Sequence, residues 1–247
     1  MVNSSVGALI VAATPGELQG LLAEVDGLAQ EAVAGRPLYV GRLGALRIAA
    51  VVSGIGKSNA AMATATALQL AAAPWVLSVG VGGGYPDSGL DVGDLAVATV
   101  EIYGDEGVDT PSGWEGLETI GIPLWRAEGR EYFGRLPTDA EGSSSLARAA
   151  EKEGKVVEGP FVTVSTVTGS AARAATLEER FAAVCETMEG AAIAHAALVA
   201  GSRFVQVRGI SNRVGPRHRA SWRLERAAEV SCRAAVRWLK GLAGAVA

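Results

Sequence analysis

The sequence predicts an α/β protein, in which helices pack on the faces of a central β-sheet. Short runs of β-branched and other apolar residues alternate along the chain with alanine-rich stretches. The chain has 247 residues, of which 49% are apolar, so it can bury one large core and is not a disordered segment. We find no internal repeat and expect a single domain over residues 1–247.

The first half of the chain supplies most of the predicted sheet. The first apolar run ends at Thr14-Pro15-Gly16, and the proline marks the start of a helix because its fixed φ suits the first helical position. The later apolar runs predict strands, and the alanine-rich stretch between them predicts a helix. In order, we expect a strand at residues 8–13, a helix at 16–25, strands at 38–41 and 46–53, a helix at 57–73, and strands at 75–80 and 94–103.

The second half begins with a long segment, residues 104–144, that is rich in Gly, Pro, Asp and Glu. It predicts an irregular excursion, and a loop of this length is more often functional than accidental. Beyond it the alternation of strand and helix patterns resumes. In order, we expect a helix at 142–153, a strand at 161–165, a helix at 171–181, a strand at 184–187, a helix at 189–200, a strand at 204–210 and a helix at 222–242.

Charge and apolar runs exclude several classes of partner. The net charge is −4, although residues 203–240 carry ten basic side chains against two acidic ones. Because the whole chain is acidic and aromatic residues do not interleave with these arginines, we expect a local anion site or a solvated helix face and no nucleic acid partner. The apolar runs are too short to cross a membrane, and no secretory signal precedes them, so we expect a cytoplasmic protein without membrane contact.

Familiar cofactor motifs are incomplete. The two cysteines, Cys185 and Cys232, lie far apart, so neither a disulfide framework nor a zinc site is expected. The triplet Gly-Lys-Ser at 56–58 lacks the first glycine of a P-loop, because Val51 stands there. The run 80–85 begins like a dinucleotide fingerprint but ends in tyrosine. We therefore expect no metal and no organic cofactor.

Polar residues and glycines gather where the predicted strands end, which is where open α/β sheets bind their ligands. Glu17 follows the first strand, glycines follow the strands ending at 53 and 80, Glu189 follows the strand 184–187, and Asn212 follows the last strand. Each has an ordinary structural alternative. An acid in a first helical turn is most often a cap, and an Asn after a strand often forms an Asx turn.

The motifs at these strand ends, taken in order and spacing, resemble the purine nucleoside phosphorylase and nucleosidase superfamily, in particular its methylthioadenosine nucleosidase-like branch. The resemblance covers nearly the whole chain. It implies a three-layer α/β/α domain with a central mixed β-sheet. It rests on residues 53–57 (SGIGK), Gly82-Gly83 followed by Val92-Gly93-Asp94, residues 187–195 (TMEGAAIAH) and residues 207–212 (VRGISN).

Within this superfamily, residues 211–223 are similar to the futalosine hydrolases of the alternative menaquinone route. This likeness implies hydrolysis of the N-glycosidic bond of futalosine to hypoxanthine and dehypoxanthine futalosine. It also implies a small-molecule nucleoside substrate, no cofactor, and a homodimer or higher homo-oligomer in which a neighbouring subunit closes part of the pocket, with the excursion and its Trp114 and Trp125 as one candidate contribution.

The resemblance assigns three catalytic residues. Glu17 matches the acid that activates water, and Glu189 matches the acid that accepts hydrogen bonds from the ribose hydroxyls, with Met188 packing on the sugar. Relatives that act on adenine nucleosides have Asp at the position of Asn212. An amide supplies N–H donors to the N7 and O6 acceptors of a 6-oxopurine but has no ionisable proton, so we expect hypoxanthine or guanine as the base.

Other residues are expected to bind the substrate. A cluster after the last strand is expected to hold the carboxylate and ring of the 5′ substituent of futalosine: Arg213, Arg217, Arg219 and Trp222, with His218 weaker. Thr166 stands where many nucleosidases have a stacking Phe, so Phe161 is an alternative partner, and His195 is expected to be structural. Arg208 is expected to contact an anion or pair with a carboxylate such as Glu189. The remaining candidates are Ile55, Gly82, Gly83, Val167 and Ser211.

Three alternatives stay open. A purine nucleoside phosphorylase needs basic residues for phosphate, but residues 14–18 contain only an acid and residues 81–90 contain Asp87 and no basic residue. An adenine-type methylthioadenosine nucleosidase is a second alternative, which Asn212 disfavours. A nucleoside-binding protein without turnover is the third, and it does not explain why both Glu17 and Glu189 are present.

Overall fold

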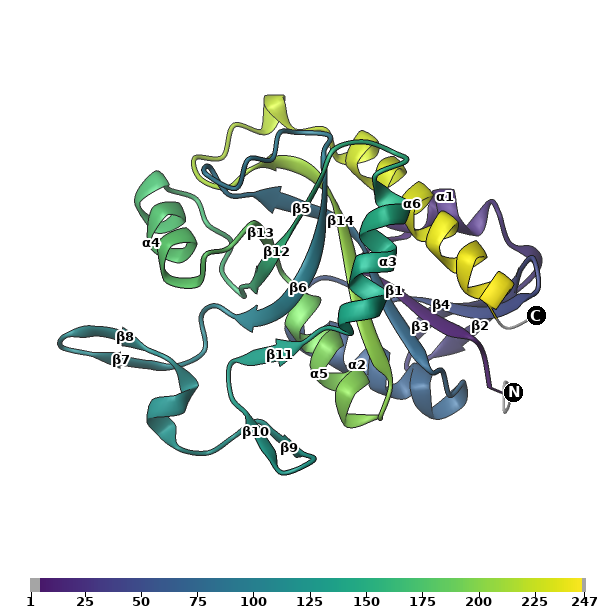
Figure 1. Ribbon diagram of the computed structural model, residues 1–247, viewed down its shortest axis with the longest axis horizontal. Coiled ribbons are helices and arrows are strands. Elements are labelled where there is room, and N and C mark those ends of the chain that lie inside the picture. Colours follow the sequence, from purple (N-terminus) through teal and green to yellow (C-terminus); the bar gives the residue numbers. More distant parts are fainter. Residues whose placement is uncertain (1–4, 246–247) are drawn as a thin grey trace.

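The computed structural model describes residues 5–245, and a ten-stranded mixed sheet forms its centre (Figure 1). The strands are β1 (Ala8–Ala12), β2 (Asp26–Val33), β3 (Arg36–Leu43), β4 (Leu46–Val52), β5 (Trp75–Gly84), β6 (Leu95–Tyr103), β7 (Val108–Thr110), β8 (Gly113–Glu115), β9 (Trp125–Ala127), β10 (Arg130–Tyr132), β11 (Arg135–Pro137), β12 (Val156–Thr163), β13 (Cys185–Thr187) and β14 (Arg203–Arg213). The helices are α1 (Gln19–Leu22), α2 (Lys57–Leu70), α3 (Ala140–Ala150), α4 (Ala171–Phe181), α5 (Gly190–Val199) and α6 (Leu224–Ala245), with 3₁₀ turns at Pro15–Glu17, Leu117–Ile120 and Arg219–Ser221.

The sheet follows the order β11-β6-β12-β13-β5-β1-β4-β3-β2, and β14 pairs with both β5 and β6. Strands β1, β4, β5 and β14 run parallel, whereas β2 and β3 pair antiparallel with their neighbours. Strand β13 pairs antiparallel with β5 and parallel with β12, and β14 pairs antiparallel with β6. The expected mixed sheet is therefore confirmed. Because the carboxyl ends of the parallel strands meet at one edge, the loops that follow them converge there.

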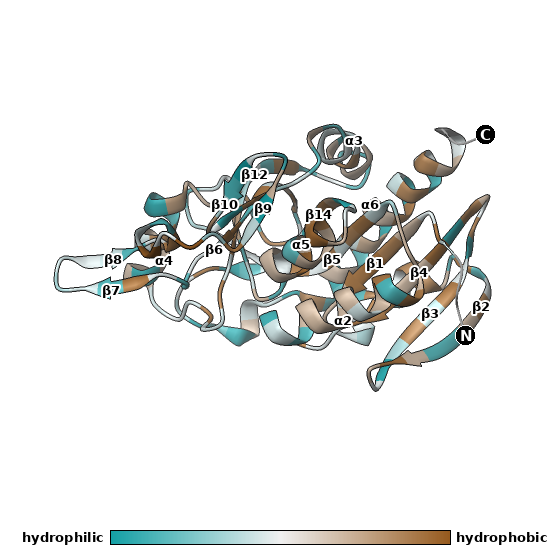
Figure 2. Ribbon diagram, turned by 90° about the horizontal axis from the view of Figure 1, so that it is seen from below, coloured by the Kyte–Doolittle hydropathy of each residue, from teal (hydrophilic) through white to brown (hydrophobic). Residues whose placement is uncertain are grey.

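Helices cover both faces of the sheet, which confirms the three layers (Figures 1 and 2). Side chains of β1 alternate between two cores: Ile10 packs with residues of α3 and α6, and Leu9 packs with residues of α2 and α5. All of β1 is buried, as expected for an uninterrupted apolar run in a parallel sheet. Alanines predominate on the buried sides of α2 and α5, so these two helices can pack closely against each other and the sheet.

Several element predictions need correction. The strand expected to end at residue 80 continues to Gly84, because its glycines pair with both β13 and β14. The helix expected at 16–25 is a 3₁₀ turn followed by the short α1. The excursion at 104–144 is not irregular throughout: it contains the hairpins β7–β8 and β9–β10, and these extend away from the sheet (Figure 1).

The edge strand β2 was not predicted. Most of its side chains are exposed, so it lacks the apolar pattern that marks a strand in sequence. Among the strands of residues 5–245 its one partner is β3, and it lies on the opposite side of the molecule from the excursion (Figure 1).

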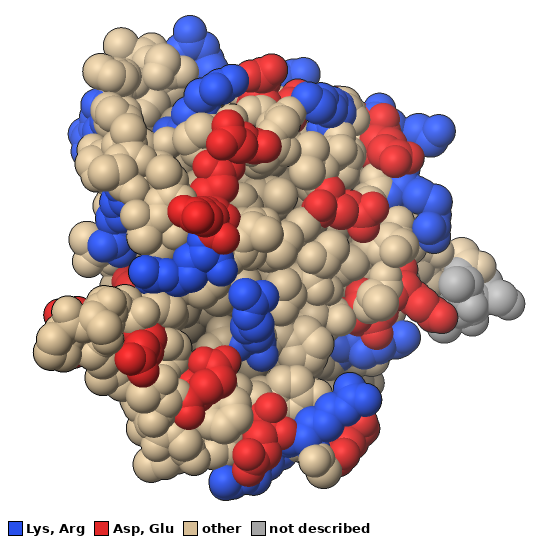
Figure 3. Space-filling view, turned by 60° about the vertical axis from the view of Figure 1, so that its left-hand side comes forward, with Lys and Arg blue, Asp and Glu red and all other residues tan. Residues whose placement is uncertain are grey.

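The surface is mixed in charge on the face drawn in Figure 3, where basic and acidic side chains lie among one another. Within residues 5–245, no helix combines the length and apolar character needed to cross a membrane.

Candidate functional site

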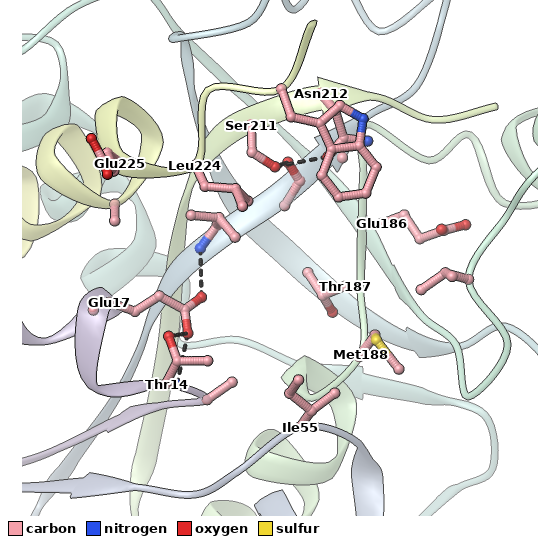
Figure 4. A pocket seen from close by; sticks show the side chains of 18 of the residues that line it. Thr14, Glu17, Ile55, Glu186, Thr187, Met188, Ser211, Asn212, Leu224 and Glu225 are labelled. Atoms are coloured by element: carbon pink, nitrogen blue, oxygen red, sulfur yellow. Dashed lines mark hydrogen bonds between the residues drawn. The ribbon is translucent and has the colours of Figure 1, made fainter. Parts of the chain in front are cut away.

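A cavity of about 960 Å³ lies at the carboxyl ends of the parallel strands, between the loop after β1, the ends of β5 and β14, and the start of α6 (Figure 4). It brings together most of the predicted site residues. Those that line it are Glu17, Ile55, Gly82, Gly83, Val167, Met188, Glu189, Ser211, Asn212, Arg213, Arg217 and Trp222. Thr166, Arg208 and Arg219 are not among them.

Hydrogen bonds from its own loop and from β5 hold the carboxylate of Glu17 at the wall of the cavity. The backbone N–H and the hydroxyl of Thr14 donate to its Oε2, both at 2.9 Å, and the backbone N–H of Val81 donates to its Oε1 at 2.9 Å (Figure 4). Glu17 is buried. The expected capping role is therefore present, and the same carboxylate also lines the cavity.

Arg208 lies beneath this carboxylate and does not line the cavity. Its Nη1 is 3.8 Å from Glu17 Oε1, and its Nη2 donates to the hydroxyl of Ser78 at 2.9 Å. The guanidinium is only 1% exposed. The carboxylate paired with Arg208 is thus Glu17 and not Glu189, which the sequence analysis named, and a direct anion contact from the cavity is not supported by this placement.

Gly80 has a steric role here. A Cβ at this position would lie 2.3 Å from Glu17 Oε1 and 2.5 Å from Arg208 Nη1, and its φ is +150°. Only glycine leaves room for the carboxylate and guanidinium to meet across the strand.

Glu189 begins α5 and is buried. The backbone N–H of Gly56 donates to its Oε1 at 2.8 Å, so the loop after β4 and the loop after β13 meet at this side chain. The pKa of Glu189 is raised, chiefly because the carboxyl group is buried and also because Glu17 carries a negative charge nearby. The charge of Arg208 and the hydrogen bond from the Gly56 N–H lower the pKa and offset part of this rise. The two carboxylates therefore repel each other electrostatically.

Asn212 lies on β14 beside Gly83 of β5. The hydroxyl of Ser211 donates to Asn212 Oδ1 at 2.8 Å, and Asn212 Nδ2 donates to the carbonyl of Arg213 at 3.0 Å (Figure 4). The second N–H of Nδ2 can therefore donate to a ligand, and the amide oxygen, which accepts from Ser211, keeps a second lone pair.

The basic loop contributes less than expected. Arg217 lies over the ring of Trp222, 4.9 Å from its centroid, and both line the cavity. Arg213 lines the cavity too but is paired with Asp91 at 2.8 Å. Arg219 is exposed outside the cavity, because the chain turns there into a 3₁₀ helix.

Three further expectations concern aromatic and neighbouring side chains. Phe161 is fully buried in a separate apolar cluster and does not reach the cavity, so it is not the stacking partner. Thr166 is exposed outside the cavity, and His218 likewise does not line it. His195 packs against Tyr103, whose hydroxyl is 3.4 Å from His195 Nδ1, as expected for a structural histidine.

Glu186 and Thr168 also line the cavity, and the sequence analysis gave neither of them a role. The carboxylate of Glu186 accepts hydrogen bonds from the backbone N–H of Thr168 at 2.9 Å and from the hydroxyl of Tyr85 at 3.2 Å. Glu186 directly precedes the Thr-Met-Glu motif, which was the available signal. The sequence did not indicate that Glu186 faces the cavity, because the antiparallel pairing of β13 with β5 could not be predicted from the strand pattern.

Within residues 5–245, no group of three or more His, Cys, Asp or Glu side chains is arranged to hold a metal ion.

Known proteins resemble this chain over most of its length. A model of the phosphorylase superfamily matches residues 8–243. A futalosine hydrolase of Thermus thermophilus is 36% identical over 78% of this chain and 81% of its own, and one of Streptomyces coelicolor is 38% identical over 70% of this chain and 71% of its own. The crystal structure of a 5′-methylthioadenosine/S-adenosylhomocysteine nucleosidase from Neisseria meningitidis with methylthio-immucillin-A has a TM-score of 0.83 at 24% identity, covering 97% of this chain and 99% of that one.

Proposed function

Because this chain belongs to the phosphorylase superfamily, we propose that it is a nucleosidase that hydrolyses the N-glycosidic bond of futalosine to hypoxanthine and dehypoxanthine futalosine. One observation carries the proposal: Glu17, Glu189 and Asn212, far apart in sequence, line a single cavity. The two relatives named futalosine hydrolase support the choice of substrate.

The two acids supply what the reaction needs at the sugar. As the bond between C1′ and the base breaks, positive charge develops on the ribose and negative charge on the purine. Glu189 accepts hydrogen bonds from the ribose hydroxyls and stabilises the cationic sugar. Glu17 removes a proton from the water whose oxygen forms the new bond to C1′, while the bonding electrons leave with the purine, which takes a proton from solvent.

The polar groups of β14 suit a 6-oxopurine. Asn212 Nδ2 has a second N–H besides the one it donates to Arg213, and this N–H can donate to O6 or N7 of the base. Asn212 cannot transfer a proton to N7, so it stabilises the leaving base through a hydrogen bond alone.

The 5′ substituent extends toward the start of α6. Arg217 and the ring of Trp222 form a stacked pair on the cavity wall, and this pair offers a cation for the benzoate carboxylate and a face for its ring.

Hydrolysis is favoured over phosphorolysis by the charges around Glu17. Among the described residues that line the cavity, the basic ones are Arg213, the last residue of β14, and Arg217 in the loop that follows it. The buried guanidinium of Arg208 is engaged by Glu17 and Ser78. A carboxylate at the nucleophile position repels phosphate and suits water.

The experiment is chromatography of futalosine, inosine and methylthioadenosine after incubation with the protein, with and without phosphate. The proposal expects hypoxanthine from futalosine at equal rates in both buffers. Release that requires phosphate and yields a sugar 1-phosphate would identify a phosphorylase. Adenine from methylthioadenosine would identify an adenine-type nucleosidase, and unchanged futalosine would leave a binding protein.

A further inference from the structure

We propose that Glu101, a buried acid on β6 outside the cavity, is a positioning residue for the site: it keeps a proton and so leaves the charge of Arg208 to Glu17. The inference rests on the proposed function, in which Glu17 is the acid that activates water. It gives a role to a buried titratable group and to the Gln206 amide beside it, neither of which lines the cavity.

The first observation is the imbalance of charge beneath the cavity. Glu17, Glu189 and Glu101 are all buried, and among the described residues Arg208 is the one buried base. Its Nη1 lies 3.8 Å from Glu17 Oε1, and its charge lowers the pKa of both Glu189 and Glu101. Buried charges require pairing, and one guanidinium cannot pair with three carboxylates. The arrangement is therefore stable when at least one of the three acids carries a proton.

Hydrogen bonds indicate that this acid is Glu101. Glu17 accepts three hydrogen bonds, two of them from backbone N–H groups, and Glu189 accepts one from a backbone N–H at 2.8 Å. Such donors stabilise a charged carboxylate. Within residues 5–245, Glu101 accepts from the Thr163 hydroxyl at 3.3 Å, and its Oε1 has no partner. Burial raises the pKa of Glu101 to about 8, so it is protonated at neutral pH.

The second observation is a set of buried polar atoms without partners beside this acid. In the described part of the chain, neither polar atom of the Gln206 amide has a hydrogen-bond partner, and Arg208 Nε also lacks one. A Cβ at Gly190 would lie 2.5 Å from Glu101 Oε2 and 2.8 Å from both Gln206 Nε2 and Oε1, so the carboxyl group and the amide flank the same point. Gln206 and Arg208 share a face of β14, because they are two residues apart. Gln206 therefore neighbours both Glu101 and Arg208.

The Gln206 amide suits a neutral acid. A protonated carboxyl group has one O–H donor and keeps acceptor lone pairs, and an amide offers both an acceptor oxygen and N–H donors. Each of the two groups can thus satisfy the other, whereas an ionised carboxylate has acceptors alone. The pair is also consistent with glycine at position 190, because a larger residue there would collide with both side chains.

Ionisation of Glu101 would add a second negative charge beside the guanidinium that pairs with Glu17. Arg208 would then be attracted toward β6, and its interaction with the Glu17 carboxylate would weaken. Since Glu17 removes the proton from the attacking water in the proposed reaction, its position sets the rate. The proton on Glu101 therefore maintains the site, and its loss in alkaline solution lowers kcat.

Other titratable groups also face this region. They are Arg208 on β14, Cys185 on β13, Tyr103 on β6 itself and Glu189 at the start of α5, whereas β12 contributes the hydroxyl of Thr163. Burial raises the pKa of the Cys185 thiol and of the Tyr103 hydroxyl above their ordinary values, so both stay neutral as Glu101 titrates. The pKa of Glu189 is raised too, and the experiment below separates it from Glu101.

The test is the pH dependence of kcat for futalosine hydrolysis by the unmodified protein and by Glu101→Gln, whose amide cannot ionise. We expect kcat of the unmodified protein to fall about tenfold from pH 8.5 to pH 9.5, and kcat of Glu101→Gln to change less than about twofold over this range. Glu158→Gln, an exposed acid of the same sheet on β12, is the matched control and is expected to keep the alkaline fall. Circular dichroism at each pH verifies that the proteins are folded.

A second measurement does not depend on the folding of Glu101→Gln. Difference infrared spectroscopy of the unmodified protein follows the band of a protonated carboxyl group as the pH rises. We expect this band to disappear with the same midpoint as kcat. It is expected to remain in Glu189→Gln at neutral pH, which distinguishes Glu101 from the other acid with a raised pKa.

Four results would overturn the inference. They are a flat profile of the unmodified protein, an equal alkaline fall in Glu101→Gln, a kcat of this variant that is lower by one factor at every pH, as a merely structural role predicts, and no protonated carboxyl band at neutral pH. Absence of futalosine hydrolysis at every pH contradicts the proposed function itself. Hydrolysis with any of these four results contradicts only the role of Glu101.

Discussion

Glu17 shows how one side chain can serve both the fold and the site. Its carboxylate accepts from Thr14 at the start of the 3₁₀ turn, which is the structural role that sequence alone made most common. It also accepts from Val81 on β5, and this second contact draws it over the end of the sheet. The capping pattern can be recognised in the sequence, but the contact between residues 17 and 81 cannot. Only the resemblance therefore indicated that Glu17 also belongs to the site.

Glu17→Gln keeps the size of the side chain and removes its basicity. We expect kcat for hypoxanthine release from futalosine to fall by about 10²- to 10⁴-fold, the usual contribution of positioned proton transfer, with KM nearly unchanged. Steady-state kinetics measure both. Glu24→Gln, an acid of the same region that pairs with Lys240 on the surface, is the control. An unchanged kcat would remove Glu17 from the mechanism.

Asn212→Asp tests whether the side chain at this position selects the base. The new carboxyl group can carry a proton to N7 and accept from an exocyclic amine, so preference is expected to move toward the 6-amino analogue of futalosine. The measured quantity is the ratio of kcat/KM for the two substrates, with an expected change of about tenfold or more. If the ratio stays constant, Asn212 does not read the base.

At the scale of the element, pattern and structure agree where a strand is buried on both faces. The apolar runs of β1 and β4 predicted both strands to within one or two residues. The excursion hairpins and β2 were missed because they pack little apolar surface, and side-chain periodicity then carries no signal. Glu186 was given no role for a different reason: strand order in a mixed sheet depends on crossovers that local sequence does not record.

Strand β6 carries a buried acid whose titration affects the stability of the fold. Glu101 is fully buried, its Oε2 accepts from the Thr163 hydroxyl at 3.3 Å, and burial raises its pKa from 4.5 to about 8. Between these values the folded chain holds a proton that the unfolded chain releases. Stability therefore falls as pH rises through this window, by up to about 1.4 kcal/mol per pH unit from this group.

We expect Glu101→Gln to flatten this dependence, because the amide cannot ionise. Urea unfolding at pH 5, 6, 7 and 8 gives the free energy of unfolding for both proteins. The unmodified protein is expected to lose more stability from pH 5 to pH 8 than the variant. Parallel curves would show that Glu101 does not keep its proton in the folded state.

The loop between β14 and α6 is expected to distinguish futalosine from simpler nucleosides. Arg217→Ala removes the guanidinium stacked on Trp222, and we expect KM for futalosine to rise about threefold or more, a modest effect because the side chain is exposed. Inosine lacks the 5′ carboxylate, so its kinetics are expected to be unchanged. Arg219→Ala, which alters an arginine outside the cavity, is the control. Equal effects on both substrates would contradict the assignment.

On the scale of the whole molecule, the site forms where distant segments meet at the end of one sheet. The parallel alignment of β1, β4, β5 and β14 brings together residues 17, 55, 83 and 212, so the cavity is built from several segments that are distant in sequence. The general rule for open α/β sheets predicted this edge. It could not predict that Arg208 points beneath the cavity, since that depends on Gly80 leaving space across the neighbouring strand.

The excursion gives the molecule a surface that a second copy of the chain can cover. Ile120 and Ile122 on it are 47% and 69% exposed, and burial of large apolar side chains favours association. We propose a homodimer or larger homo-oligomer, so sedimentation equilibrium is expected to give at least twice the chain mass of 25.2 kDa. Ile122→Glu is expected to weaken the assembly toward the single chain. Leu28→Glu, on the exposed β2 at the opposite side of the molecule, is expected to leave it intact (Figure 1). A single-chain mass for the unmodified protein would contradict the proposal, and equal effects of both substitutions would place the contact elsewhere.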